Sequence, residues 1–302
     1  MANPARRYVR RVRSVTDGFV AIDVGGSRIK SALVVNGEAE EAPPRPVSHG
    51  LRELLRQIVS VYERTGRGEE VQWGLCMPGL VDVDAGRVRH SVALGLRDIP
   101  VLELLERDLP RPRVFVNDLV AAAVGEAAGG TIALIQIGTG IAGRWVVDGI
   151  PQTGKNAFAG EIGHLRFRPD GRTCLCGNSG CAEAYGGWGA VRLCYELAGR
   201  SVWSPADVVR DARTDPWARR VLEDAFEAIG FAASTLVAVC DPGTLRVGGG
   251  LAAAWGEPLL ATIREALAVG VLSEVAAATR VECAKLGERA SLLGLAALAA
   301  RS

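Results

Sequence analysis

The sequence predicts an α/β protein made of two lobes of related design. Apolar runs at 19–22 and 29–35 flank a glycine-containing turn, and the same strand–turn–strand pattern returns at 131–147. Stretches with apolar residues at helical spacing lie between and after these two units. Strands that alternate with helices are typical of the α/β class, and the repeated unit indicates a second lobe.

The elements expected in the first half of the chain end at recognisable signals. Apolar side chains at helical spacing predict a helix over 51–62, and the strand 71–76 stops at the turn Met77-Pro78-Gly79. The remaining elements of this half are a short helix at 101–105, a buried strand at 114–116 and an Ala-rich helix at 119–128.

The second half is expected to be mainly helical. It opens with the strands 131–137 and 144–147, which are joined through the turn Gly138-Thr139-Gly140. One further strand, 244–247, runs into Gly248-Gly249-Gly250. The expected helices of this half span 186–200, 216–240, 257–270 and 288–300.

Composition excludes several functional classes. The 302 residues carry a net charge of +1, which provides no overall attraction to nucleic acid or membrane. No apolar run approaches the roughly 20 residues of a membrane span. The seven Cys residues follow no export signal, so we expect a cytoplasmic protein. The N-terminal arginines are expected to form a solvated tail, with nucleic-acid contact as the alternative; they are Arg6, Arg7, Arg10, Arg11 and Arg13.

A short cysteine-rich run carries the most specific chemical signal. Cys174, Cys176 and Cys181 fall within eight residues, and His164 lies ten residues before the first of them. Three thiolates and one imidazole complete a tetrahedral zinc site with no open position, which predicts a structural metal. Buried free thiols or a redox group are the alternatives. Glu161 and Glu183 flank the run and are available to bind a substrate.

Three glycine-rich turns are candidates for nucleotide binding. Where the chain lacks β-carbons, a phosphate can approach the backbone N–H groups closely, and a hydroxyl adds a donor. Ordinary turns between strands, or between a strand and a helix, are the alternative for each. The residues concerned are Asp23, Gly25, Gly26 and Ser27 in the first turn, Gly138, Thr139 and Gly140 in the second, and Gly248, Gly249 and Gly250 in the third.

Asp118 is the best candidate for a catalytic base. A carboxylate at the end of a buried strand is held rigidly, and phosphoryl transfer to a hydroxyl needs such a group to accept the proton. Asn117 beside it can bond a neighbouring hydroxyl. The alternative is that Asp118 only caps the helix that begins at Leu119. His164 can ligate zinc through one ring nitrogen and meet a hydroxyl with the other.

Taken together, these residues resemble the ROK family (repressors, open reading frames and sugar kinases). The similarity extends from about residue 18 to residue 300. Its most specific segments are A-G-E-I-G-H at 159–164 and C-L-C-G-N-S-G-C-A-E at 174–183. The less specific segments are D-V-G-G-S-R-I (23–29), M-P-G-L-V-D (77–82), V-N-D (116–118), I-G-T-G-I (137–141) and V-G-G-G-L (247–251).

The resemblance implies a two-lobed actin-like ATPase (ribonuclease H-like) fold with an interlobe cleft and a zinc-stapled loop. The smaller lobe is expected to comprise 1–118 plus 288–302, and the larger lobe 119–287. The implied activity is ATP-dependent phosphorylation of a primary hydroxyl of a hexose or hexose-like polyol, with Mg²⁺ carried by ATP. Asp118 is then the general base, and the glycine turns bind ATP. The implied sugar ligands are Asn117, Glu161, His164 and Glu183, and the implied zinc ligands are His164, Cys174, Cys176 and Cys181.

Departures from the family pattern leave the acceptor open. The first phosphate turn has Ser27-Arg28 where the family usually has Thr-Lys, and Ala142 replaces a glycine after the second turn. The segment 93–98 lacks the usual Asn or Trp, and Tyr185-Gly186-Gly187-Trp188 replaces a region of small residues. The last two changes are expected near the sugar pocket. They leave room for another hexose, an N-acylated amino sugar or a C7 cyclitol.

Two other classes of function compete with a kinase. A sugar-responsive ROK-type repressor would carry an added DNA-binding domain, and the 22 residues before Asp23 are expected to be too few for one. A zinc-binding interaction module would explain the cysteines, but it would leave Asp118 and the glycine turns without a role. The resemblance also implies a homo-oligomer, either a dimer or a tetramer.

Overall fold

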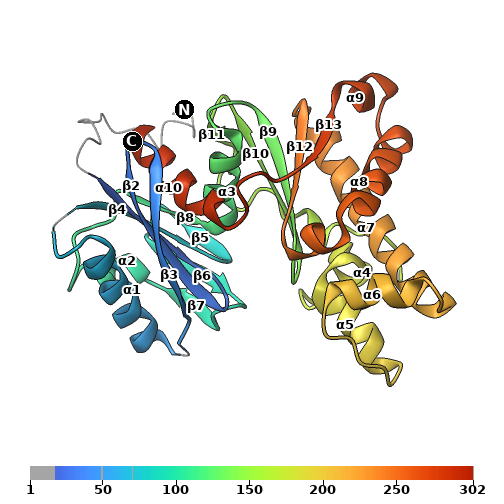
Figure 1. The fold of residues 1–302 in the computed structure, drawn as a ribbon, viewed down its shortest axis with the longest axis horizontal. Coiled ribbons are helices and arrows are strands. Elements are labelled where there is room, and N and C mark those ends of the chain that lie inside the picture. Colours follow the sequence, from blue (N-terminus) through green and yellow to red (C-terminus); the bar gives the residue numbers. More distant parts are fainter. Residues whose placement is uncertain (1–17, 49, 70, 302) are drawn as a thin grey trace. The chain divides into compact units, whose positions relative to one another are not determined.

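The first sheet grows from the N-terminal hairpin. The computed structural model describes residues 18–48, 50–69 and 71–301, so the Arg-rich segment lies outside the described residues. Strand β1 (Phe19–Val24) pairs antiparallel with β2 (Arg28–Val35) and parallel with β4 (Gln72–Met77). With β3 (Glu38–Pro46) and β8 (Val114–Asn117), the sheet has the order β3-β2-β1-β4-β8. Figure 1 labels β2, β3, β4 and β8 of this sheet.

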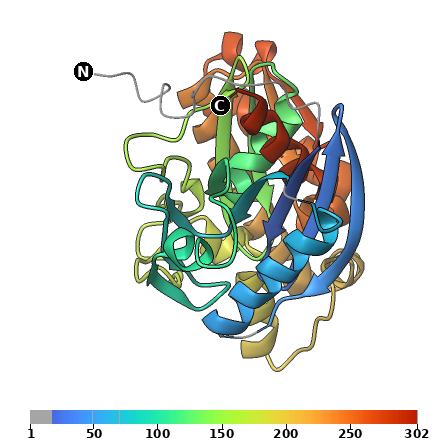
Figure 2. The ribbon, with the colours of Figure 1, turned by 90° about the vertical axis from the view of Figure 1, so that its left-hand side faces the viewer.

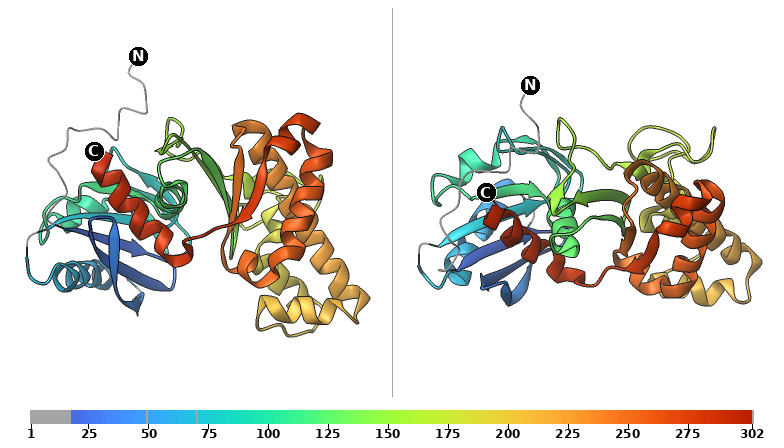
Figure 3. Two further views of the ribbon diagram at one scale, coloured as in Figure 1. Left: turned by 45° about the horizontal axis from the view of Figure 1, so that its top comes forward. Right: turned by 90° about the horizontal axis from the view of Figure 1, so that it is seen from above.

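Helices cover both faces of this sheet, so all six residues of β1 are buried. Helix α1 (Leu51–Thr65) packs on the face that carries Val20 and Ile22, and Figure 2 shows it lying across the strands. Helix α10 (Ala290–Arg301) packs on the other face, where Gly74 lies between Phe19 and Leu295. The left panel of Figure 3 shows α1 and α10 on opposite sides of the sheet.

Helix α3 (Asp118–Ala127) packs closely against α10. A β-carbon at Gly294 would come within 1.8 Å of the Ala121 carbonyl oxygen, so this helix crossing requires glycine. A three-stranded antiparallel sheet follows β4 in the sequence, and none of its strands is among those predicted from the sequence. Its strands are β5 (Leu80–Asp82), β6 (Arg87–Ser91) and β7 (Leu96–Ile99), followed by helix α2 (Val101–Leu105).

The second large sheet repeats the hairpin-plus-parallel design. Strand β9 (Ile132–Ile137) pairs antiparallel with β10 (Ile141–Val147) and parallel with β12 (Thr244–Gly248), which in turn pairs with β13 (Arg280–Cys283). Helix α7 (Pro216–Cys240) and helix α8 (Gly250–Gly270) bury one face of this sheet. The short strand β11 (Ile150–Pro151) follows β10.

The remaining elements are short. They are η2 (Ile162–His164), α4 (Glu183–Gly186), α5 (Trp188–Leu197), α6 (Pro205–Ala212), α9 (Ser273–Ala278) and η3 (Gly287–Arg289). The single helix expected at 186–200 is wrong, because Gly187 is extended (φ −78°, ψ 148°) and separates α4 from α5. Helix α8 begins before the expected residue 257 and is kinked at Gly256, two residues before Pro258.

The chain divides into two units by its internal contacts. Unit 1 comprises the described residues up to Gly130, the segment Asp148–Ala159 and the chain from Glu288 onward. Unit 2 comprises Thr131–Val147 and Gly160–Gly287, including the cysteine-rich run. The lobe boundaries implied by the family resemblance, at 118/119 and 287/288, remain a prediction. Among the described residues, no helix is long and apolar enough to cross a membrane.

Candidate functional site

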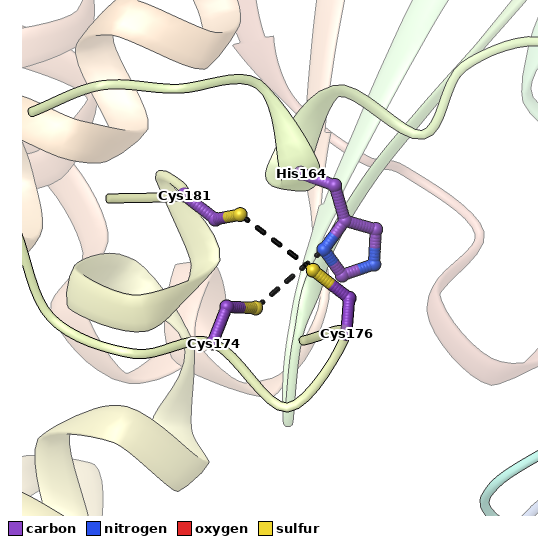
Figure 4. Close-up of side chains that lie close together, drawn as sticks. All are labelled: His164, Cys174, Cys176 and Cys181. Carbon is purple, nitrogen blue, oxygen red and sulfur yellow. Dashed lines mark hydrogen bonds between the residues drawn. The ribbon is translucent and has the colours of Figure 1, made fainter. Parts of the chain in front are cut away.

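Four side chains of unit 2 converge where zinc is predicted (Figure 4). The ligand atoms of His164, Cys174, Cys176 and Cys181 all lie within 4.8 Å of one another. Nδ1 of His164 is 3.7 Å from Sγ of Cys174, and the Sγ atoms of Cys176 and Cys181 are 3.7 Å apart. Thiolates bound about 2.3 Å from one tetrahedral zinc ion would be separated by about 3.8 Å. The donor set and its spacing therefore fit a closed zinc site.

The backbone of the cysteine-rich run forms a tight loop. The N–H of Cys174 donates to the carbonyl of Asn178 at 2.8 Å, and the N–H of Ala182 donates to Leu165 at 3.0 Å. Gly180 has φ +79°, and a β-carbon there would come within 1.8 Å of the Arg168 carbonyl oxygen. Only glycine allows this turn, which brings the last cysteine back to the histidine segment.

The thiols of the loop differ in their proton affinity. Burial raises the pKa of the Cys181 thiol to about 12 and also raises the pKa of Cys174. Burial acts in the same direction on Cys176, but hydrogen bonds from Asn178 and the neighbouring thiols outweigh it and lower the pKa. Zinc ligands are thiolates, so metal binding would release protons from this loop.

The Tyr185 side chain contacts the loop that carries the three cysteines, which we call the metal loop. Its hydroxyl accepts a hydrogen bond from the N–H of Arg172 at 2.9 Å, and the Arg172 guanidinium lies 4.4 Å from the ring centre. Arg168 and Arg172 each form an ion pair of 2.9 Å with Asp224 of α7. Tyr185, a departure from the family pattern, therefore links the loop to α4, and the two arginines link it to α7.

Glu183 lies on α4, two residues after the last cysteine. Its Oε2 accepts a hydrogen bond from the N–H of Ile141 at 2.9 Å. A β-carbon at Gly140 would come within 2.1 Å of the same oxygen. The N–H of Trp188 donates to the carbonyl of Gly138 at 2.9 Å. The predicted sugar-binding carboxylate is therefore in direct contact with the second glycine turn.

Glu161 is held by an arginine that the sequence analysis missed. Nη2 of Arg144 donates to Oε1 of Glu161 at 3.0 Å, and the Arg144 side chain is 4% exposed. The N–H of Gly143 donates to the carbonyl of Gly160 at 2.8 Å, which ties this segment to β10. No motif includes Arg144; the one available signal was a charged residue within an otherwise apolar strand.

At the end of β8, the side chain of Asn117 orients the side chain of Asp118. The Asn117 side-chain oxygen caps α3 by accepting from the N–H groups of Leu119 (3.0 Å) and Val120 (3.2 Å). Its side-chain nitrogen donates to the carbonyl of Gly79 and to Oδ1 of Asp118, each at 2.9 Å. The main helix cap is thus Asn117, although Asp118 also accepts from Leu119. The amide of Asn117 is largely committed to these bonds.

Asp23 sits in a buried polar cluster beside the first glycine turn. Its Oδ2 pairs with Nζ of Lys30 at 2.8 Å and accepts from the Ser291 hydroxyl at 2.6 Å. Burial alone would lower the pKa of Lys30, but the Asp23 carboxylate outweighs it and raises the pKa. Burial, followed by the charges of Asp23 and Asp118, raises the pKa of Cys76 well above its usual value. Since β4 lies between β1 and β8, both carboxylates face the same end of the sheet of unit 1.

The third glycine turn opens helix α8. Gly249 has φ +97° and would clash with the Ile137 carbonyl oxygen if it carried a β-carbon. Gly250 then begins the helix, so the unpaired N–H groups of its first turn are available for an anion. In unit 1, Gly26 lies against Ala93, so the divergent segment 93–98 is next to the first glycine turn.

Two mixed sheets of repeated design, together with a histidine–cysteine metal loop, define the class of the protein. A family model described as "ROK family" matches residues 19–302, and the chain belongs to this family. A glucokinase from Halalkalibacterium halodurans is 29% identical over 91% of this chain and 93% of its own length. An N-acetylmannosamine kinase from Haemophilus influenzae is 28% identical over 92% and 93%.

Solved structures agree with this assignment. A ROK hexokinase from Thermus thermophilus superposes with a TM-score of 0.79 at 28% identity, covering 93% of this chain and 97% of its own. A ROK family glucokinase from Streptomyces griseus, solved with glucose and AMPPNP, has a TM-score of 0.77 at 25% identity, over 94% and 100%. The prediction of the two-lobed ROK fold is thereby confirmed.

Proposed function

We propose that this protein is an ATP-dependent kinase that phosphorylates a primary hydroxyl of a hexose or hexose-like polyol. The observation that carries the proposal is that Glu161 and Glu183 both bond to strand β10, directly after a glycine turn, while His164 between them in the sequence belongs to the histidine–cysteine cluster. Relatives of matching length include a glucokinase and an N-acetylmannosamine kinase.

In this proposal each acceptor ligand has one interaction with the protein and one group left for a hydroxyl. Glu161 uses Oε1 for Arg144, and Glu183 uses Oε2 for Ile141, so each retains an oxygen that can accept a hydroxyl proton. His164 directs Nδ1 toward the cysteines, which leaves Nε2 for the acceptor. Carboxylate and imidazole groups that each accept or donate one hydrogen bond are well suited to a polyol.

Asp118 is the proposed general base. Phosphoryl transfer needs a carboxylate that accepts the hydroxyl proton as the bond to phosphorus forms. The Asn117 amide donates to Oδ1 of Asp118, so Asn117 orients the base in addition to its proposed contact with the sugar. Mg²⁺ would arrive with ATP and neutralise the phosphate charge, whereas zinc would hold the loop without contacting the phosphoryl group.

The proposed nucleotide ligands are the three glycine turns. Gly25 and Gly26 in the first turn, and Gly138 and Gly140 in the second, lack β-carbons, so phosphates could approach the backbone there. The N-terminus of α8 at Gly250 offers free N–H groups. Asp23 is fixed by Lys30 and Ser291 and would orient a magnesium-bound water.

The acceptor is to be found by screening. A coupled ADP-release assay with Mg-ATP would test glucose, mannose, fructose, allose, N-acetylated hexosamines and C7 cyclitols. We expect turnover with at least one of them, and at least a 10³-fold lower kcat in Asp118→Asn, which removes the base. Asp215→Asn, at the N-cap of α7, changes a carboxylate remote from these residues in sequence and should retain kcat. Normal turnover in Asp118→Asn would remove Asp118 from this role.

The alternatives predict different results. Exclusive turnover of a C7 cyclitol or an N-acylated amino sugar would identify a specialised kinase. Sugar-dependent binding to DNA without ATP turnover would identify a ROK-type regulator and overturn the kinase proposal. The homo-oligomeric state and the cytoplasmic location expected from the sequence remain predictions.

A further inference from the structure

Arg144 is a buried cation with an incomplete set of hydrogen bonds. Its Nη1 donates to the carbonyl of Gly143 at 2.7 Å, and its Nη2 donates to Glu161 at 3.0 Å. Its Nε is buried and has no hydrogen-bond partner among the described residues. Burying a guanidinium costs free energy unless the charge is paired. The ion pair with Glu161 is therefore the main interaction that stabilises the buried Arg144 side chain.

The exposure of the two partners is strongly unequal. The Arg144 side chain is 4% exposed, whereas that of Glu161 is 38% exposed. The arginine is therefore a fixed part of unit 2, and the glutamate is the member that can meet a ligand. Since Nη2 occupies Oε1, the carboxylate cannot rotate freely, and Oε2 is left as the acceptor atom.

We propose that Arg144 is a positioning residue for acceptor binding, acting through Glu161. This inference rests on the proposed function, in which Glu161 binds the acceptor. The ion pair holds Oε1 and thereby orients Oε2, so this position recognises a hydroxyl proton. Because the arginine compensates the charge of Glu161, the pair favours a neutral polyol hydroxyl over the ammonium group of an amino sugar at this point.

The chain contains a matched control for this idea. Arg246 on β12 and Arg144 on β10 both align with Leu134 of the intervening strand β9, so their side chains share one face of the sheet. Arg246 also pairs with a partly exposed glutamate, Glu282, and its Nε also lacks a partner among the residues described. The hydrogen bond and ion pair of Arg246 are made with Glu282, which is not one of the proposed acceptor ligands.

The test compares Arg144→Met with Arg246→Met in the full chain. Both variants remove a guanidinium of similar burial and leave behind a glutamate that water can hydrate. The probe is D-glucose or, if it is not phosphorylated, the panel member with the highest kcat/KM. We expect Arg144→Met to raise the acceptor KM by about 10-fold or more while the KM for ATP changes less than about 2-fold. Arg246→Met should leave both KM values unchanged.

A double-mutant cycle separates positioning from general support. If Arg144 acts through Glu161, then Arg144→Met combined with Glu161→Gln should raise the acceptor KM no further than the more damaging single change. Arg144→Lys retains the charge and should recover part of the affinity. If Arg144→Met does not fold, Arg144→Lys provides the same comparison with wild type, with a smaller expected rise in acceptor KM.

Each of the other outcomes contradicts the role of Arg144, the role of Glu161 or the proposed function. If Glu161→Gln impairs acceptor binding and Arg144→Met does not, the inference about Arg144 fails alone. If both arginine variants raise the acceptor KM equally, the role of Arg144 is general support of the sheet. If Glu161→Gln leaves the acceptor KM unchanged, Glu161 is not an acceptor ligand and the inference about Arg144 fails, although the kinase activity itself stands. If no panel member is phosphorylated, the proposed function fails on this panel and the inference falls with it.

Discussion

The Oε2 atom of Glu183 accepts a hydrogen bond from the backbone N–H of Ile141 at 2.9 Å. Glu183 follows the last cysteine of the metal loop by two residues, and Ile141 follows the turn Gly138-Thr139-Gly140 directly. A single carboxylate thus joins the metal loop, the proposed acceptor ligands and a proposed phosphate-binding turn within unit 2.

Gly140→Ala should disturb this carboxylate. The added β-carbon would come within 2.1 Å of Glu183 Oε2, so the side chain must move away from Ile141. We expect kcat/KM for the acceptor to fall by about 10- to 100-fold, as positioned binding groups are lost. Steady-state kinetics of the purified variant measures this effect.

Gly189→Ala is the control for that change. It adds a methyl group that would lie 3.7 Å from the Thr139 carbonyl oxygen, an ordinary contact with the same turn. Its kcat/KM should stay within about 2-fold of wild type. Equal losses in the two variants would mean that the turn tolerates no added bulk, and would remove the argument for Glu183.

Cys176→Ser should remove metal from the loop. Cys176 is exposed, so its replacement costs little packing and reports mainly on ligation. Elemental analysis should find well below one zinc ion per chain, together with a lower Tm and a raised acceptor KM, since metal binding and folding of the loop are coupled. Cys283→Ser changes another exposed thiol and should keep its zinc. Full zinc content in Cys176→Ser would contradict the four-ligand site.

Asn117→Ser should separate the two roles of Asn117, which are to cap α3 and to orient Asp118. Serine keeps an oxygen that can cap α3, but it loses the side-chain N–H groups bonded to Gly79 and Asp118. We expect a kcat at least about 10-fold lower, because the base is no longer held. Asn117→Ala should show the same kinetic loss and an additional destabilisation of about 1 kcal/mol from the missing cap, measured by urea unfolding. Wild-type kcat in Asn117→Ser would show that Asp118 needs no such support.

Tyr185→Phe and Tyr195→Phe form a matched pair in one core. The Tyr185 hydroxyl accepts from Arg172 N–H, whereas the buried Tyr195 hydroxyl has no partner among the described residues. Tyr185→Phe should therefore cost about 1–3 kcal/mol in the free energy of unfolding, and Tyr195→Phe should be neutral or stabilising. Chemical denaturation of both variants decides the point; equal costs would rule out a special role for the Tyr185 bond.

Much of the fold could be predicted because its signals are local. The hairpins at β1–β2 and β9–β10 are apolar strands around glycine turns, and α7 begins at Asp215-Pro216, a cap followed by proline. The strand β3 (Glu38–Pro46) was missed because its sequence is polar and proline-rich. Such a strand is stable only as the edge of a sheet that other strands supply.

The four predicted metal ligands could be recognised from their spacing, since a metal loop concentrates its ligands in a short segment. The family followed from the same motifs. The partners of the acceptor ligands were not evident. Arg144 lies 17 residues before Glu161, and Ile141 lies 42 residues before Glu183. Such pairs depend on strand register and on where a loop returns to its sheet, which local sequence does not encode. The sequence by itself thus determined the class of fold and the chemistry of the metal loop, and the tertiary structure decided which groups hold the proposed site residues in place.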